Sequence, residues 1–123
     1  MKILIADDDP SMRKLLNDAL SLAGCEVIQA ETGRQAIDLA KQATPDLILL
    51  DHTMPEMKGY DAMKEIRKEP ALAQVPVVLI TGNFEVQGMA EDDKLERCAF
   101  LPKPYSIDQL MTTIGVALGR PFP

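Results

Sequence analysis

The chain has 123 residues, the length of one ordinary domain, and its 46% hydrophobic content is enough for a packed core, which argues against global disorder. A formal net charge of −6 argues against a nucleic-acid-binding surface, which needs clustered Lys and Arg. No apolar run is long enough to cross a membrane, and the first residues lack the pattern of a signal peptide. We therefore expect a cytoplasmic protein whose two cysteines, Cys25 and Cys98, stay reduced.

Short apolar runs alternate with helical patterns along the whole chain. Their Val, Ile and Leu residues are consecutive, which is typical of parallel strands covered by helices on both faces. The predicted strands are residues 3–6, 27–30, 47–50, 77–80 and 99–101. The pattern predicts an α/β domain of the (βα)5 type, with three layers.

Local signals mark the first two helices. Asp9 followed by Pro10 is typical of an N-cap and the first helical position, and Gly24 is expected to end this helix. Thr32 and Gln35 have the spacing of a capping box, which predicts the start of the second helix.

The last three helices differ in how clearly the sequence marks them. The third is expected over residues 59–68, because it has to end before Pro70. The last is expected to begin after Ser106 and to end at Gly119. Between residues 83 and 97 apolar positions are sparse, so we expect the fourth helix to be short or mobile.

Carboxylates follow two of the predicted strands. Asp7 and Asp8 come directly after the first strand, and Asp51 comes directly after the third. If these strands are parallel neighbours, the three acids meet at one edge of the sheet and repel one another strongly. A hard divalent cation with oxygen ligands, Mg²⁺ above all, would stabilise such a cluster. Asp9 is expected only to cap the first helix.

Other polar groups follow the remaining strands, with Thr81-Gly82 after the fourth and Lys103-Pro104 after the fifth. Together with Asp51 as an oxygen nucleophile, they suit transfer of a phosphoryl group to a carboxylate. Mg²⁺ and Lys103 would neutralise the phosphoryl oxygens, and Thr81 could hydrogen-bond to one of them. No general base is required, because a carboxylate is already ionised at neutral pH.

An ordered set of motifs runs along essentially the whole chain: Asp7-Asp8, Asp51, Met54-Pro55, Gly59, Thr81-Gly82 and Lys103-Pro104. In this order and spacing the set resembles the receiver domain of two-component response regulators, here expected over residues 1–123. The resemblance implies a doubly wound, five-stranded parallel sheet with the flavodoxin-like order 2-1-3-4-5. It also implies that a histidine kinase or histidine phosphotransfer protein phosphorylates Asp51. Output would be a protein–protein contact on the face of the last two helices and the last strand.

The resemblance assigns roles to the site residues. It implies Mg²⁺, with Mn²⁺ as the alternative ion, bound by Asp8, Asp51 and the backbone carbonyl of Thr53. Asp7 would lie nearby and act through water. Thr53 and Asn83 would stand at the positions that influence how long the phosphoryl group survives.

The resemblance also implies a switch. Thr81 would move toward the phosphoryl group, with Gly82 and Lys103 completing its binding set, and Phe100 would then rotate inward. Such a switch is a population shift, because phosphate has to bind one state better than the other. The Lys103–Pro104 peptide bond would be cis.

The chain departs from the family pattern at one place. Glu96-Arg97 stand where the family usually has Gly-Ala, so we expect the left-handed glycine that ends the fourth helix to be missing. His52, the only histidine, is interpreted as a neighbour of Asp51 without a role of its own. From its start at Met1 we expect a complete single-domain protein.

Alternative functions remain open at this point. One is a Mg²⁺-dependent phosphatase with an aspartyl nucleophile, but such an enzyme generally needs a second acid where Thr53 stands. A flavin-binding protein of similar fold would need a neutral phosphate-binding loop in place of Asp7-Asp8-Asp9. A degenerate receiver would only dock partners. We expect a signalling protein that is not an enzyme beyond its own phosphorylation and dephosphorylation.

Overall fold

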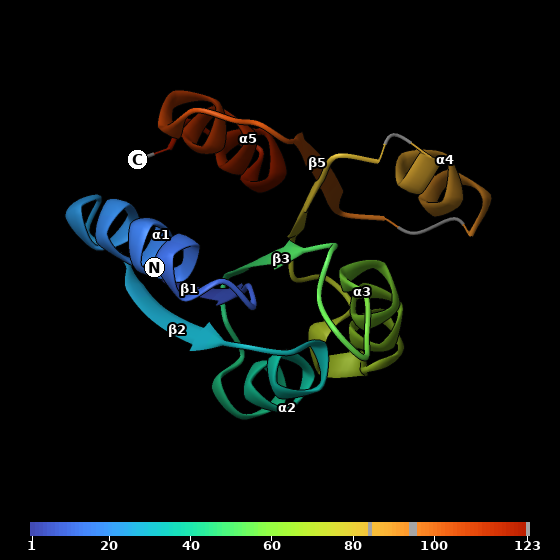
Figure 1. The fold of residues 1–123 in the computed structure, drawn as a ribbon. Helices are drawn as coiled ribbons and strands as arrows, with labels where there is room; N and C mark the ends of the chain where they lie inside the picture. The colour runs from blue at the N-terminus through green and yellow to red at the C-terminus, as the bar shows by residue number, and fades with distance from the viewer. Residues whose placement is uncertain (84, 94–95, 123) are drawn as a thin grey trace.

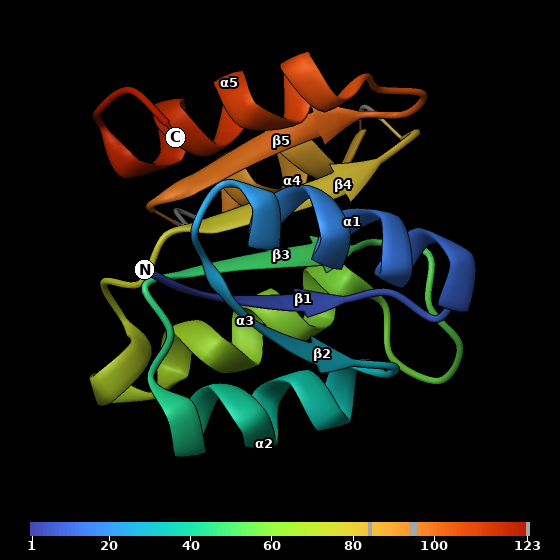
Figure 2. The same cartoon turned by 90° about the vertical axis from the view of Figure 1, so that its left-hand side faces the viewer.

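The computed structural model describes residues 1–83, 85–93 and 96–122, which form a central sheet between two layers of helices (Figures 1 and 2). Five parallel strands pair in the order β2-β1-β3-β4-β5, so the predicted fold class and strand order are confirmed. The strands are β1 (Lys2–Ala6), β2 (Glu26–Ala30), β3 (Leu47–Asp51), β4 (Val77–Thr81) and β5 (Cys98–Pro102). The helices are α1 (Pro10–Leu22), α2 (Gly33–Ala43), α3 (Gly59–Lys68), the short 3-10 helix η1 (Pro70–Leu72), α4 (Glu85–Asp92) and α5 (Ile107–Leu118).

The apolar core is divided by the sheet into two clusters. On one face α1 and α5 cover the sheet, and residues such as Ile3, Leu16 and Leu110 pack there. On the other face α2, α3 and α4 cover it, and Leu4 and Tyr60 belong to that cluster. Every residue of β3 and β4 is buried, which explains why these strands are consecutive apolar runs. No helix in the described part of the chain has the length and hydrophobicity needed to span a membrane.

The helix starts follow the predicted caps, with one correction. Asp9 Oδ1 accepts the N–H of Ser11 (2.9 Å), as an N-cap does, and α1 ends at Leu22 just before Gly24. Thr32 Oγ1 accepts the N–H of Gln35 (3.1 Å), but the Gln35 amide bonds to the N–H of Glu31 rather than to that of Thr32. The second helix therefore has only half of the predicted capping box, whereas Ser106 and Gln109 form a complete one.

The helix α4 has eight residues, Glu85–Asp92, which agrees with the prediction of a short helix. Its start is capped by Asn83, whose Oδ1 accepts the N–H of Glu85 (2.9 Å). Glycine is absent from the positions before β5, as predicted. A left-handed conformation is nevertheless present there, because Arg97 adopts φ 55°. The Arg97 carbonyl accepts from Val77 N (2.9 Å) and from Arg67 Nη2 (2.9 Å), and these bonds hold Arg97 in place before β5.

We expect Arg97→Gly to be more stable than Arg97→Ala by about 1 kcal/mol, because alanine retains the cost of a left-handed conformation and glycine does not. Both variants lose the bond from Arg97 Nε to Gln74 Oε1 (2.7 Å), so the comparison isolates the backbone. Urea denaturation measures the difference. Equal stabilities, or a more stable alanine variant, would show that Arg97 is not strained.

Candidate functional site

Three carboxylates meet beyond the carboxyl ends of two neighbouring strands. Asp51 is the last residue of β3, and Asp7 and Asp8 directly follow β1, whose Ala6 is paired with Leu50. One oxygen of each carboxylate lies within 4.8 Å of the others. Asp7 is 4% exposed and Asp51 is 3% exposed, whereas Asp8 is open to solvent. The parallel pairing therefore brings together the acids that the sequence placed at two strand ends.

Lys103, in the loop after β5, supplies the cation that faces this cluster. Its Nζ lies 2.6 Å from Asp51 Oδ1 in an ion pair. Oδ1 is buried, and among the described residues no hydrogen-bond donor other than this ammonium group faces it. One ammonium group cannot balance three carboxylates, so the cluster keeps an excess of negative charge.

The electrostatics of Asp7 show the same crowding. Burial raises the pKa of the Asp7 carboxyl, the bond from the N–H of Asp9 (2.9 Å) opposes that rise, and the negative charge of Asp51 reinforces it. A hard cation would remove this repulsion. Because the available ligand atoms are oxygens of three crowded carboxylates, the set fits Mg²⁺ or Mn²⁺. Thr53 is exposed in the loop after β3. Its backbone carbonyl as a further metal ligand stays a prediction.

The loop after Asp51 is organised by His52, which the sequence interpretation had left without a role. The His52 carbonyl accepts from Met54 N (3.2 Å) and from Gly59 N (3.0 Å), and its Nδ1 accepts from Tyr60 N (3.3 Å). Burial lowers the pKa of His52, and Lys58 lowers it further, which suits the neutral ring that this acceptor role requires. His52 thus fixes the start of α3 against the end of β3.

Thr81 is the buried last residue of β4, the strand next to β3. Its Oγ1 accepts the N–H of Asn83 (2.9 Å), and its carbonyl accepts the N–H of Lys103 (3.0 Å). The second bond ties the backbone of Lys103 to β4. Asn83 and Gly82 are exposed, and a Cβ on Gly82 would meet nothing within 4 Å, so close packing does not require glycine there.

The peptide bond between Lys103 and Pro104 is cis. An apolar groove of about 620 Å³ opens beside it, between the start of α1 and the start of α5. Its lining comprises Met12, Leu15, Lys103, Pro104, Tyr105, Ser106 and Ile107. Because Lys103 lines this groove and contacts Asp51, a molecule bound in it would lie next to Asp51.

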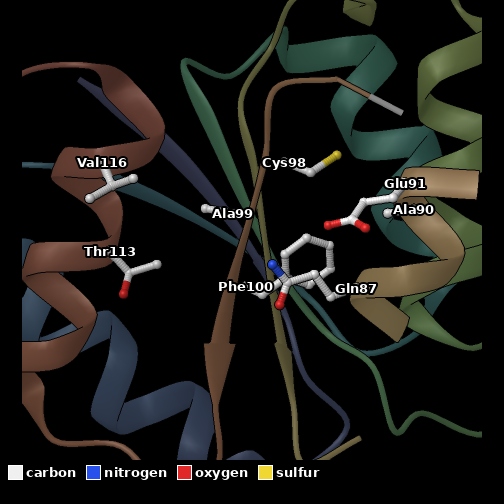
Figure 3. A pocket seen from close by; sticks show the side chains of 8 residues that line it. All are labelled: Gln87, Ala90, Glu91, Cys98, Ala99, Phe100, Thr113 and Val116. Atoms are coloured by element: carbon white, nitrogen blue, oxygen red, sulfur yellow. The ribbon is translucent and has the colours of Figure 1, made fainter. Parts of the chain in front are cut away.

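Phe100 lies in β5 and is half-buried against the core on the α4 side of the sheet. Figure 3 shows its ring between the strand and α4, beside Gln87 and Ala90. These residues line a groove of about 430 Å³ that continues to Thr113 and Val116 of α5. The predicted switch aromatic therefore lines the groove between the two helices of the predicted output face.

A second contact that sequence reasoning missed ties α3 to the end of α4. The Tyr60 hydroxyl donates to Asp93 Oδ2, and Lys64 Nζ lies 4.0 Å from the same oxygen. Burial raises the pKa of Tyr60 above its usual value, so the phenol keeps its proton and donates. Because the N–H of Tyr60 donates to His52, Tyr60 joins the loop after Asp51 to the end of α4.

We expect Tyr60→Phe to lower the free energy of unfolding by about 1–2 kcal/mol, as for loss of a bond to a charged group. Hydrogen exchange should become faster in the last turn of α4. Tyr105→Phe is the control, because the Tyr105 hydroxyl donates only to Met12 Sδ (3.3 Å), a weak acceptor. An unchanged exchange rate in α4 would rule out the tie between the helices.

Comparisons with known proteins agree with this fold. The family model "Response regulator receiver domain" matches residues 3–115. The polar-differentiation response regulator DivK of Brucella ovis is 33% identical over 118 residues, which is 95% of this chain and 95% of DivK. The probable transcriptional regulator ycf27 of Guillardia theta is 35% identical over 97% of this chain and 46% of its own length. The chain therefore spans about half the length of the ycf27 relatives that it matches.

Solved structures give the same result. The chemotaxis protein CheY4 of Vibrio cholerae superposes with a TM-score of 0.86 at 30% identity, covering 95% of this chain and 98% of that chain. The receiver domain of the sensor histidine kinase PA1611 from Pseudomonas aeruginosa PAO1, solved with a magnesium ion in its active site cleft, has a TM-score of 0.82 at 28% identity and covers 96% of this chain and 97% of that one. Since the family model spans residues 3–115, this chain belongs to the response regulator receiver domain family of two-component signalling.

Proposed function

We propose that Asp51 accepts a phosphoryl group from a phosphohistidine of a histidine kinase or histidine phosphotransfer protein, in a Mg²⁺-dependent reaction. The observation that carries this proposal is the buried Asp51 carboxylate, which lies among two further acids and one lysine. The magnesium ion in the PA1611 receiver supports the choice of metal. We extend the proposal to a single receiver domain over residues 1–123 that acts in the cytoplasm.

Each residue of the site has a different role in phosphoryl transfer. A carboxylate oxygen of Asp51 attacks phosphorus, the bond from phosphorus to the donor's imidazole nitrogen breaks, and an acyl phosphate forms on Asp51. When bound, Mg²⁺ neutralises charge on the acceptor and the phosphoryl oxygens. Lys103 Nζ pairs with a phosphoryl oxygen, and Thr81 Oγ1 donates to another after leaving the N–H of Asn83.

We infer that the output is a change in the groove between α4 and α5. Two hydrogen bonds connect Thr81 to α4. Thr81 Oγ1 accepts the N–H of Asn83, and Asn83 Oδ1 accepts the N–H of Glu85 at the start of α4. A Thr81 hydroxyl drawn to the phosphoryl group would release that bond, and Phe100 lies beside the same helix. The phosphorylated state then presents a different surface to a target protein.

The apolar groove beside Lys103 is the surface where we place the phosphodonor. Leu15 is 49% exposed and Ile107 is 37% exposed, and both line this groove next to the acceptor. A phosphodonor has to bury the exposed apolar residues of this groove and bring its phosphohistidine within reach of Asp51. Helices of the donor that cover the groove would do both.

We expect Leu15→Asp to slow phosphotransfer from a protein donor about tenfold or more, the effect of losing one buried interface side chain. Phosphorylation by acetyl phosphate should stay unchanged. Leu22→Asp is the matched control, since Leu22 lies on the same helix and is 90% exposed but does not line the groove. The donor is chosen from a panel of phosphorylated histidine kinases as the one that phosphorylates the wild-type chain fastest. Equal slowing by both substitutions would contradict this placement.

Intact-mass spectrometry after incubation with acetyl phosphate and Mg²⁺ tests the proposed function. We expect one added phosphoryl group on the wild-type chain, none after chelation of Mg²⁺, and none on Asp51→Asn. Asp38→Asn, which removes an exposed carboxylate of α2, should be modified normally. Modification of Asp51→Asn at the wild-type rate would refute the assignment.

A further inference from the structure

Arg13 of α1 reaches the acidic cluster from outside the predicted set of site residues. Its Nη1 donates to the backbone carbonyl of Asp7 (2.7 Å), and its side chain is only 12% exposed. Its own N–H donates to the carbonyl of Asp9 (3.0 Å). The bond to Asp9 is the first backbone bond of α1 and is independent of the side chain, whereas the guanidinium group fixes the carbonyl of Asp7, next to Asp8. We propose that Arg13 is a positioning residue for the Mg²⁺ site, an inference that rests on the proposed function.

The backbone of Asp7 is held from several directions, and Arg13 supplies the contact from α1. The N–H of Asp7 donates to Ala30 O in β2 (3.2 Å), and Asp7 Oδ1 accepts the N–H of Asp9 (2.9 Å). Without Arg13, the peptide group that joins Asp7 to Asp8 loses the one side-chain donor that it has among the described residues and can rotate. Such a rotation would turn both carboxylates away from the position at which they face Asp51.

A guanidinium group suits this position better than an ammonium group. While Nη1 bonds to Asp7, Nη2 lies 3.5 Å from Glu31 Oε1, so the planar group makes contacts in two fixed directions. Glu31 is 70% exposed, and an ion pair that open to solvent contributes little. The bond to the Asp7 carbonyl is therefore the contact that matters for the metal site.

The experiment measures Mg²⁺ binding to the metal-free protein by isothermal titration calorimetry, without any phosphodonor. We expect Arg13→Ala to weaken Mg²⁺ binding about 10–100-fold, the usual loss when a residue that orients metal ligands is removed. Lys14→Ala is the matched control: it removes the same charge from the neighbouring position, where Lys14 pairs with Asp18 on the surface (2.8 Å). It should change the affinity less than about twofold. Arg13→Lys should bind with an affinity between those of wild type and Arg13→Ala.

Hydrogen exchange in the absence of metal separates positioning from a general charge effect. The N–H of Asp9, which donates to Asp7, should exchange faster in Arg13→Ala than in Lys14→Ala. Equal Mg²⁺ affinities for these two variants, or an unchanged Asp9 exchange rate, would overturn the inference. If Arg13→Ala does not fold, Arg13→Lys serves as the test, and a wild-type affinity of this variant for Mg²⁺ would overturn the inference. A wild-type chain that binds no Mg²⁺ at millimolar concentration would remove the proposed function itself, which is a distinct outcome.

Discussion

Replacing Gly59 with Ala is expected to lower the free energy of unfolding by about 3 kcal/mol, the upper part of the range for overpacked sites. A Cβ on Gly59 would lie 2.9 Å from the carbonyl carbon of Asp51 and 2.9 Å from the Cα of His52. Both neighbours are backbone atoms, and they cannot retreat without moving the end of β3. The substitution should therefore also displace the Asp51 carboxylate from Asp7 and Asp8, and acetyl phosphate should modify the chain much more slowly.

Gly88→Ala is the matched control for this prediction. Gly88 lies within α4, and a Cβ there would meet nothing within 4 Å. Alanine is favoured over glycine in a helix by about 1 kcal/mol, so this variant should be slightly more stable than the wild type. Urea denaturation measures both changes. A Gly59→Ala protein with wild-type stability would mean that β3 and the start of α3 do not approach as closely as described.

Asp7→Asn is expected to change stability and metal binding in opposite directions. In the metal-free protein it removes one of three crowded carboxylates, and we expect the free energy of unfolding to rise by about 1 kcal/mol. Affinity for Mg²⁺ should fall about tenfold or more, because a group that holds the metal or its water is lost. Thermal unfolding with and without Mg²⁺ measures both effects.

Asp9→Asn is the control for the effect of charge. Asp9 is exposed and caps α1, and asparagine caps helices as well as aspartate does, so this variant loses the same charge but keeps the cap. It should alter neither stability nor Mg²⁺ affinity by more than a small amount. If Asp7→Asn behaves like Asp9→Asn, the carboxylates of the cluster do not share a cation.

The stability gain from Asp7→Asn should depend on pH. Burial, reinforced by the charge of Asp51, raises the pKa of Asp7 in the folded state. Folded wild-type protein then binds a proton at a pH where the unfolded chain does not, so its stability rises as the pH falls through that raised pKa. The variant has no such proton. Its advantage should be complete at neutral pH and should vanish near pH 4, about the pKa of an unfolded Asp.

The sheet and the acidic cluster could be predicted from the sequence because both follow from local patterns. Consecutive apolar residues mark strands that are covered on both faces, and the acids stand where those runs stop. The structure extends the predicted strands by a residue at one or both ends, so that Asp51 and Thr81 are the last residues of β3 and β4 rather than the first residues after them. The backbone pairing of the sheet therefore fixes the positions of Asp51 and Thr81.

The residues that support the site could not be predicted in the same way, because their contacts depend on how distant elements pack. Tyr60 meets Asp93 across 33 positions of the chain. Arg13 has the sequence pattern of an ordinary polar helix position, and its contacts arise only because the start of α1 lies beside the ends of β1 and β2. The role of His52 follows from the return of the chain at Gly59, which puts the N–H of Tyr60 beside its ring.

The turn into β5 shows a different limit. The sequence correctly predicted that the usual left-handed glycine would be missing before β5, but it gave no sign that another residue would adopt this conformation, which side chains disfavour. Arg97 adopts it, with φ 55°. The Arg97 carbonyl is bonded to Val77 and to Arg67, which also donates to the carbonyls of Leu72 (3.1 Å) and Glu96 (3.0 Å). Tertiary hydrogen bonds here outweigh a local preference.

The measurement that tests the central claim most directly is the chemical identification of the phosphorylated residue. Borohydride reduces an acyl phosphate to a primary alcohol, which would convert a phosphorylated Asp51 into homoserine, whereas a phosphate on the neighbouring His52 would not react in this way. After phosphorylation with acetyl phosphate and Mg²⁺, peptide mass spectrometry should find homoserine at position 51 only. Homoserine at another position, or a phosphorylated chain that yields no homoserine, would contradict the account.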